Sequence, residues 1–166
     1  MTTAQTPEPQ LTTQFTMPSD REIVATRTFD APRELVWRAH VEPEHVRHWL
    51  LGPDGWSMPV CEIDLRPGGA WRYTWRNDKT GHEFSMFGTY KEVDPPHRVV
   101  HTETMDPGMP ETLNTMVLTE ENGRTTLTVT VLYASKEARE AALATGMLGG
   151  WSQSYDRLEQ HIATVR

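Results

Sequence analysis

Cysteine, basic segments and long apolar runs are scarce in this sequence, and each scarcity excludes a class of protein. The one cysteine, Cys61, cannot form a disulfide within the chain and is typical of a reducing cytoplasm. No apolar run approaches the roughly 18 residues of a membrane-spanning helix, so we expect no membrane insertion. The first residues lack the basic and apolar regions of a secretory signal, which also favours a cytoplasmic location.

Positive charge is also in short supply. The net charge of -7 and the pI near 5.5 argue against nucleic acid or an anionic membrane surface as a partner.

Motifs that carry chemistry are missing as well, because the chain has no GxSxG, no Walker loop and no GxGxxG. The sequence therefore predicts no catalytic residue, and an enzyme is the less favoured class.

The length of 166 residues suits one domain with a substantial core. Residues 1–20 are rich in Thr, Gln and Pro and show no apolar periodicity, so we expect a flexible N-terminal tail. The single folded domain is expected over residues 21–166.

The spacing of apolar residues predicts the elements of this domain. A strand is expected over 21–30, followed by two short helices, each with a proline near its start, over 30–41 and 42–50. From Trp56 to Tyr133 the period changes to two, with turn residues between the runs. These runs predict six strands, over 56–65, 70–76, 83–93, 97–104, 112–120 and 124–133.

One of these strands carries an unusual set of aromatic side chains. Trp71, Tyr73 and Trp75 alternate with polar residues that include Arg72 and Arg76, so one face is apolar and the other is wet. This pattern is typical of an antiparallel sheet covered on one side. We expect the aromatics to face inward; in the alternative, a bulge reverses the register and turns the arginines toward an anionic ligand.

The C-terminal segment predicts helices. Ser135 can cap a short helix that ends at Gly146, and apolar residues then recur every three or four positions from Leu148 to Val165. The complete order predicts an α+β fold in which seven antiparallel strands curve around one long C-terminal helix. Two short helices follow the first strand and close one end.

Four separated stretches resemble one known family. They are "TRTFDAPRELVWRAHVEPEHVRHWLLGP", "IDLRPGGAWRY", "YKEVDPPHRVVHTE" and "YASKEAREAALATGMLGGWSQSYDRLEQHI". Together they cover about residues 21–164 and resemble the Hsp90-ATPase-activator-homologue-like branch of the SRPBCC (START-like) superfamily. The resemblance implies a helix-grip fold with an apolar cavity between the sheet and the C-terminal helix. The branch takes its name from a co-chaperone domain, which makes a chaperone an alternative partner.

Three glycines crowd the start of the long helix. Gly146 can end the preceding helix in a left-handed turn, whereas Gly149 and Gly150 let the backbone approach the sheet or leave room beside it. Met147 and Trp151 would then line an adaptable apolar wall. Close packing of helix on sheet without any ligand explains the same glycines.

Metal chemistry has little support in the sequence. Glu44, His45 and His48 share one helix face, but no second cluster of ligands is evident and a polar helix face explains all three. Cys61 has no CxxC or paired histidine beside it, so we expect a structural role. We expect no metal and no cofactor.

The favoured function is that of a binding protein for a small apolar or aromatic molecule, lipid-like or polyketide-like, held in the cavity. His101 and Glu103 share one strand face with Val99 and add polar groups to it. A chaperone-interacting module would instead show an exposed apolar patch, and a cyclase or hydrolase would show convergent polar residues with shifted pKa values. We expect a monomer or a homodimer. The candidate cavity residues are Trp71, Tyr73, Trp75, Val99, His101, Met147, Trp151 and Tyr155.

Overall fold

The computed structural model of the chain describes residues 12–105 and 109–165. In that part of the chain, eight antiparallel strands form one sheet in the order β1-β2-β8-β7-β6-β5-β4-β3. The strands are β1 (Gln14–Thr16), β2 (Glu22–Phe29), β3 (Trp56–Ile63), β4 (Ala70–Asn77), β5 (Glu83–Asp94), β6 (Arg98–Met105), β7 (Thr112–Glu121) and β8 (Arg124–Leu132). The helices are α1 (Arg33–Val41), α2 (Pro43–Trp49), α3 (Lys136–Leu143) and α4 (Met147–Val165).

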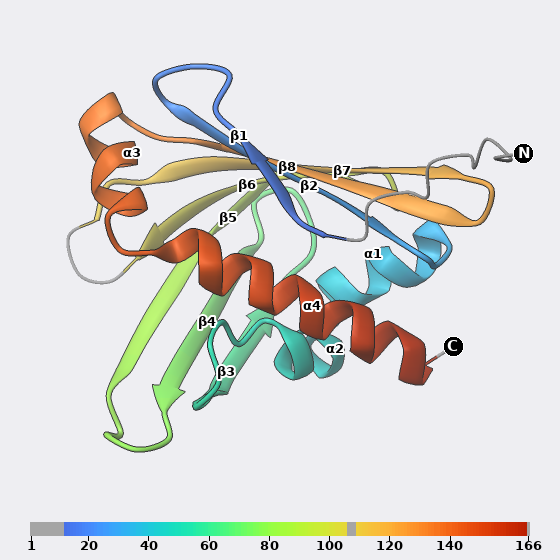
Figure 1. Cartoon of the computed structure of the whole chain (residues 1–166), viewed down its shortest axis with the longest axis horizontal. Helices are drawn as coiled ribbons and strands as arrows, with labels where there is room; N and C mark the ends of the chain where they lie inside the picture. Colours follow the sequence, from blue (N-terminus) through green and yellow to red (C-terminus); the bar gives the residue numbers. More distant parts are fainter. Residues whose placement is uncertain (1–11, 106–108, 166) are drawn as a thin grey trace, which may run out of the picture.

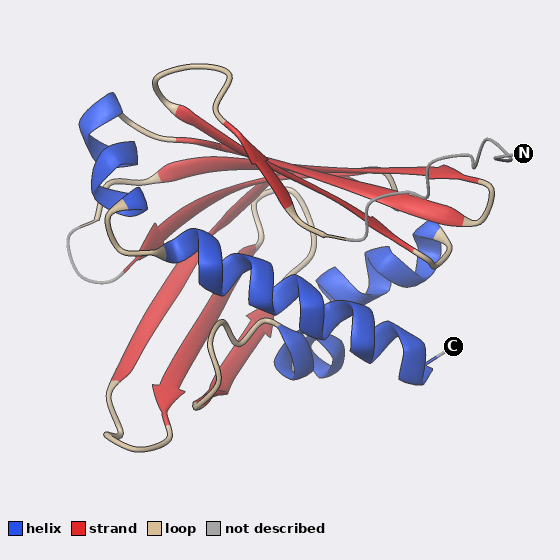
Figure 2. Cartoon of the chain, viewed as in Figure 1, coloured by secondary structure: helices blue, strands red, loops and turns tan. Residues whose placement is uncertain are grey.

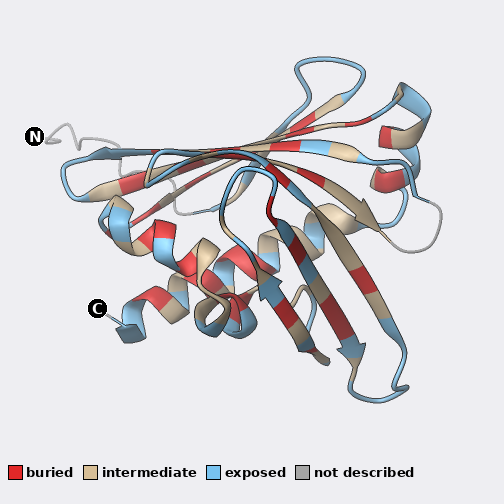
Figure 3. Ribbon diagram, turned by 180° about the vertical axis from the view of Figure 1, so that it is seen from behind, coloured by how far each residue is buried: buried red, intermediate tan, exposed pale blue. Residues whose placement is uncertain are grey.

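The sheet is strongly curved, and α4 runs across its concave side (Figure 1). Helices α1 and α2 lie at one end of α4, and α3 lies at the other (Figure 2). This arrangement is the expected α+β helix-grip fold, and the predicted strands and helices are confirmed in their order. Buried positions alternate with partly buried ones along β2, and the core lies between the concave face and the helices (Figure 3).

The strand count differs from the expected seven because Gln14–Thr16 forms β1, which pairs with Val24–Thr26 of β2. A flexible tail was expected over 1–20; residues 1–11 of it lie outside the described residues, and 14–16 instead belong to the sheet. Three residues are too few to show a period of two, so this strand could not be predicted from the pattern of apolar residues. Phe15 packs on Trp151 of α4, with ring centroids 5.4 Å apart, which holds the edge strand on the core.

Helix ends follow the residues that the sequence offers. Pro43 occupies the first turn of α2, and the Ser135 hydroxyl caps α3 by accepting a 3.0 Å hydrogen bond from the backbone N–H of Ala138. Gly146 has a φ of +77°, a left-handed conformation that separates α3 from α4. The short and long helices can therefore follow one another at an angle.

A buried arginine of β2 connects this strand to α4 by ion pairs. Arg27 of β2 is 2% exposed and faces the interior. Its guanidinium lies 2.7 Å from a carboxylate oxygen of Asp156 and 3.0 Å from one of Glu159, both on α4. These charge-assisted hydrogen bonds fix the rotation of α4 about its own axis.

Strands β5 and β6 approach one another closely at Gly88. Phe87 lies opposite Thr104 and Tyr90 opposite His101, and the register shifts further along, between Tyr90 and Glu92. A Cβ at Gly88 would overlap the backbone carbonyl of Thr102, so only glycine allows the two strands to approach this closely. The close approach holds Thr102 against β5, and its neighbours His101 and Glu103 lie on the inward face of β6.

Candidate ligand-binding cavity

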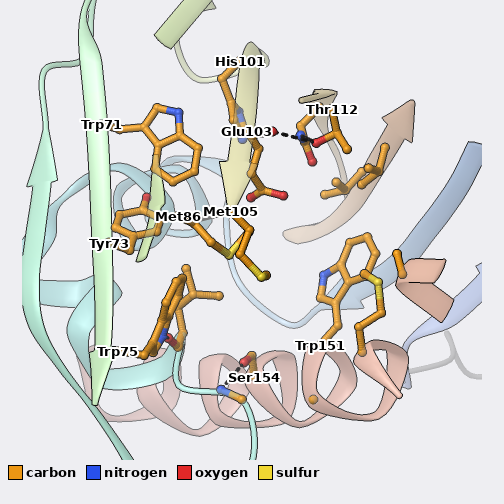
Figure 4. Close-up of a pocket in the computed structure, with 18 of the residues that line it drawn as sticks. Trp71, Tyr73, Trp75, Met86, His101, Glu103, Met105, Thr112, Trp151 and Ser154 are labelled. Carbon is orange, nitrogen blue, oxygen red and sulfur yellow. Dashed lines mark hydrogen bonds between the residues drawn. The ribbon is translucent and has the colours of Figure 1, made fainter. Parts of the chain in front are cut away.

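A cavity of about 540 Å³ lies between the concave face of the sheet and α4. Its wall is mainly apolar and draws on β4, β5, β6, β7, β8 and all four helices. All the candidate residues from the sequence lie in this wall: Trp71, Tyr73, Trp75, Val99, His101, Met147, Trp151 and Tyr155. Figure 4 labels Trp71, Tyr73, Trp75, His101 and Trp151 of this set.

An aromatic ladder forms one side of the cavity. Trp71, Tyr73 and Trp75 of β4 follow one another with ring centroids 4.8 and 5.8 Å apart. The indole N–H of Trp71 donates to the backbone carbonyl of Thr102, and that of Trp75 donates to the carbonyl of Leu50. Because both indole N–H groups already have backbone acceptors, the rings are held in place and present apolar surface to the cavity.

The outer face of β4 is polar. Arg72 and Arg76 are exposed, and the Arg72 guanidinium lies 5.3 Å from the ring centroid of Phe87. The expected orientation of the strand is therefore correct, and the alternative register with arginines in the cavity is wrong. A register shift does occur, but it lies in β3 between Ser57 and Val60.

Helix α4 supplies the opposite side. Trp151 lies across the cavity from the aromatic ladder (Figure 4). It is partly buried and borders Tyr155, with ring centroids 6.2 Å apart. The Sδ of Met147 accepts a 3.5 Å hydrogen bond from the Tyr133 hydroxyl. Two flexible or half-buried side chains thus form the part of the wall that can adapt its shape.

The glycines at the start of α4 make room for a loop and not for the sheet. A Cβ on Gly150 would lie 3.4 Å from Cδ of Pro53, whereas one on Gly149 would meet nothing within 4 Å. Of the two alternatives for these glycines, a close approach to the sheet is therefore wrong, whereas open space does lie beside Gly149. The contact made by Gly150 is with the loop over residues 50–55, which lines one end of the cavity.

That loop is fastened to α4 by polar contacts. The backbone N–H of Gly52 donates a 2.8 Å hydrogen bond to the hydroxyl of Ser154, which is 2% exposed. Arg157 donates to the carbonyl of Gly52 and forms an ion pair with Asp54. The loop thereby closes the end of the cavity beside Trp75.

Two histidines in the wall are held neutral. Burial lowers the pKa of His101 and that of His40 to about 4. The Nδ1 of His40 donates to the carbonyl of Val36 at 2.8 Å. The Nδ1 of His101 has no partner, although its ring packs edge-on against Trp71 at 5.3 Å. Sequence reasoning selected His101 and missed His40, whose helical position carries no signal of the cavity.

Glu103 is the acidic group of the cavity, and the candidate residues did not include it. Its carboxylate points into the space between the aromatic ladder and Trp151 (Figure 4). The carboxylate has no hydrogen bond or ion pair from any residue that the structure describes, and burial raises its pKa to about 7. The signal was available, because Glu103 shares the inward face of β6 with Val99 and His101.

Tyr73 and Tyr133 line the same cavity as Glu103. Burial raises the pKa of Tyr73 well above its ordinary value, and negative charge on Tyr90, Cys61 and Glu103 raises it further. Burial, with a smaller contribution from Glu103, raises the pKa of Tyr133 to about 12. The hydroxyls therefore stay protonated at neutral pH and can serve as hydrogen-bond donors to a bound molecule.

A histidine cluster lies between α2 and α4, apart from the residues that line the cavity. The Nδ1 of His45 lies 2.9 Å from the Nε2 of His161, and the His48 ring stacks on His161 with centroids 5.2 Å apart. Glu42, Glu44 and His45 offer ligand atoms within 4.8 Å of one another. The sequence showed no second group of ligands near His45 and His48, and the fold brings His161 to them from 116 residues away from His45 along the chain.

A curved antiparallel sheet that grips a long helix, with an apolar cavity between them, defines a START-like helix-grip protein. Residues 30–163 match the family described as activator of Hsp90 ATPase homolog 1-like protein, and the chain belongs to that family. The match confirms the resemblance seen in the sequence.

Solved structures from three bacteria are similar over nearly the whole chain. A Rhodobacter sphaeroides protein is 31% identical, with a TM-score of 0.87, and the match covers 92% of this chain and 99% of that one. A Nitrosomonas europaea protein is 25% identical, with a TM-score of 0.79 and coverage of 89% and 97%. A Mycobacterium smegmatis protein is 25% identical, with a TM-score of 0.80 and coverage of 90% and 95%.

A comparison with curated proteins gives no match. Over the described part of the chain, the search for a helix with the length and apolar character needed to cross a membrane finds none.

Proposed function

We propose that the protein binds a small apolar or aromatic molecule, lipid-like or polyketide-like, in the cavity between the sheet and α4. The observation that carries the proposal is a space of about 540 Å³ whose tryptophan N–H groups are already bonded to backbone carbonyls. This volume is within the range of small-molecule sites, roughly 300–1,000 Å³. Burying roughly 300 Å² of apolar ligand surface would supply roughly 7 kcal/mol before the costs of binding.

Native mass spectrometry of the protein purified directly from its host tests this proposal. We expect a small molecule to remain bound at one copy per chain and to be released by organic solvent. An apolar probe should compete with it. A protein that carries no molecule and accepts no apolar probe has a filled core, and the binding function would then be wrong.

We place this function in the cytoplasm. Support comes from the single cysteine, Cys61, which is a free and buried thiol on β3. Burial raises the pKa of that thiol, which keeps it protonated and unreactive.

A second candidate is acid–base catalysis on the bound molecule. Glu103 favours it, because a carboxyl group with a pKa of about 7 can both take up and release a proton at neutral pH. The two functions predict different fates for the ligand. After incubation in deuterium oxide, a carrier returns its ligand unlabelled, whereas an enzyme returns it changed or labelled at carbon, and Glu103→Gln abolishes that change.

We do not extend the chaperone role in the family description to this chain. Such a role calls for an exposed apolar surface away from the cavity. In the described segments, the exposed large apolar side chains are Met17, Met109, Leu113 and Val165, which come from separate loops, strands and helices.

A further inference from the structure

The described residues that line the cavity can carry negative charge near neutral pH but not positive charge. Among the described residues that line it there is no lysine and no arginine. His40 and His101, the histidines in the wall, are held neutral by burial. Glu103 is therefore the lining residue that can bring a full charge into the cavity near neutral pH, and that charge is negative.

The Glu103 carboxylate also lacks a partner among the described residues. Its backbone carbonyl accepts a 3.4 Å hydrogen bond from the Thr112 hydroxyl, a contact that leaves the carboxylate unpaired. No described residue donates a hydrogen bond to the carboxylate, whereas the buried Arg27 elsewhere in the core has two carboxylate partners. A charge in apolar surroundings is costly unless it is paired. The missing partner of Glu103 is a group that a ligand would bring.

We propose that the cavity selects apolar molecules that carry a protonated amine, with the Glu103 carboxylate as the group that pairs with the ammonium. This inference rests on the proposed binding function and names the class of ligand. An ammonium group supplies both the positive charge and the N–H donors that the carboxylate lacks. The apolar body of the ligand would lie between the aromatic ladder and α4.

The surroundings of Glu103 suit a cation for a second reason. Trp71 and Tyr73 lie on one side of the carboxylate and Trp151 on the other (Figure 4). The faces of aromatic rings attract cations, and tryptophan does so most strongly. An anionic ligand such as a fatty acid would meet these ring faces and the carboxylate without any lysine or arginine in the described wall to bind it.

Protonation of Glu103 should control the preference. Its pKa of about 7 in the free protein means that the carboxylate becomes ionised as the pH rises through neutrality. An aliphatic ammonium stays charged over the same range. Affinity for an amine should therefore rise from about pH 5.5 to about pH 8 by roughly ten-fold or more, and affinity for a neutral molecule should not.

Three probes with the same ring test the inference: 2-(1-naphthyl)ethylamine, 1-ethylnaphthalene and 1-naphthylacetate. Equilibrium dialysis of the full chain at about pH 8 gives the three dissociation constants. We expect the amine to bind roughly ten-fold or more tightly than the neutral hydrocarbon, as hydrogen bonds to charged groups allow. The anionic probe, 1-naphthylacetate, should bind most weakly.

Glu103→Gln is the decisive variant, because it keeps the size of the side chain and removes the charge. It should lose both the preference for the amine over 1-ethylnaphthalene and the pH dependence of amine binding. Glu62→Gln, at an exposed position of β3, removes the same charge away from the cavity and should change neither.

The outcomes separate this inference from the function on which it rests. If 1-ethylnaphthalene does not bind at all, the binding function itself fails. If it binds but the amine binds no more tightly, the cavity is a carrier site without the proposed selectivity. A preference for the amine that survives in Glu103→Gln also overturns the role of Glu103.

Discussion

The indole N–H of Trp71 on β4 donates a 3.1 Å hydrogen bond to the backbone carbonyl of Thr102 on β6, across the intervening strand β5. The bond is possible because Trp71 pairs with Gly88, which has no side chain to separate the ring from β6. The same contact brings Trp71 against His101 and leaves the next inward residue, Glu103, facing the cavity. One glycine thus shapes the polar end of the site.

Replacing Gly88 with alanine should destabilise the protein by about 3 kcal/mol or more. The added Cβ would overlap the Thr102 carbonyl, so β5 and β6 would have to separate and the Trp71 hydrogen bond would break. Urea unfolding monitored by circular dichroism gives the change in the free energy of unfolding. A loss under about 1 kcal/mol would mean that the strands do not approach closely in solution.

Gly149→Ala is the matched control and should have the opposite sign. A Cβ at this exposed helical position meets nothing within 4 Å. Alanine is favoured over glycine in helices by roughly 0.5–1 kcal/mol, so the variant should gain up to that amount. A marked loss of stability would show that Gly149 has a packing role that the structure does not reveal.

Trp151→Ala should enlarge the cavity and cost about 2 kcal/mol. A fully packed tryptophan would cost roughly 3–5 kcal/mol, but Trp151 is partly buried and borders open space. Affinity for an apolar probe should change in the same variant, and Trp151→Phe should lie between it and the wild type. A loss above about 4 kcal/mol with no probe binding in either protein would indicate a solid core.

Glu103→Gln should make the protein more stable at pH 8 than the wild type, by roughly 3 kcal/mol. The pKa of Glu103 rises from an ordinary 4.5 to about 7 on folding, so the folded state holds this proton more tightly. The contribution of Glu103 to stability is therefore full below about pH 4.5 and is lost as the pH rises toward 7. The amide avoids that loss.

Chemical unfolding of both proteins at several pH values measures this difference. The difference in the free energy of unfolding should be near its maximum above about pH 7 and should decrease steadily toward about pH 4.5. Burial of His40 and His101 causes an opposite trend, since their lowered pKa values cost stability as the pH falls below 6.5. That trend is common to both proteins and cancels in the comparison. A difference that does not vary with pH would mean that the Glu103 pKa is not raised.

Protein purified without an affinity tag should contain no stoichiometric metal. The Nδ1 of His45 and the Nε2 of His161 already share a 2.9 Å hydrogen bond, and the His48 ring is stacked on the ring of His161. Elemental analysis by mass spectrometry tests this expectation. One zinc or iron per chain, removed by His161→Ala, would identify a metal site at the contact of α2 and α4.

The pattern of apolar residues was enough to predict the order of the strands and helices. A period of two isolates Trp71, Tyr73 and Trp75 on one face of β4, and spacings of three and four isolate Tyr155, Leu158 and Ile162 on α4. Each of these apolar faces is removed from water when it packs against the other, so the pairing of this strand with this helix follows from local chemistry. The residues of the aromatic ladder could be named for the same reason.

The tertiary structure alone decided the polar part of the site. Glu103 lies on the inward face of β6 in any register that buries Val99, but only the packing of the sheet against the helices leaves its carboxylate in an open cavity with no partner among the described residues. His161 meets His45 and Gly150 meets Pro53 through chain crossings far apart in sequence. Local patterns specify which face of an element is apolar, because that depends on neighbours a few residues away. The geometry between elements depends on close packing across the fold, which no local spacing encodes.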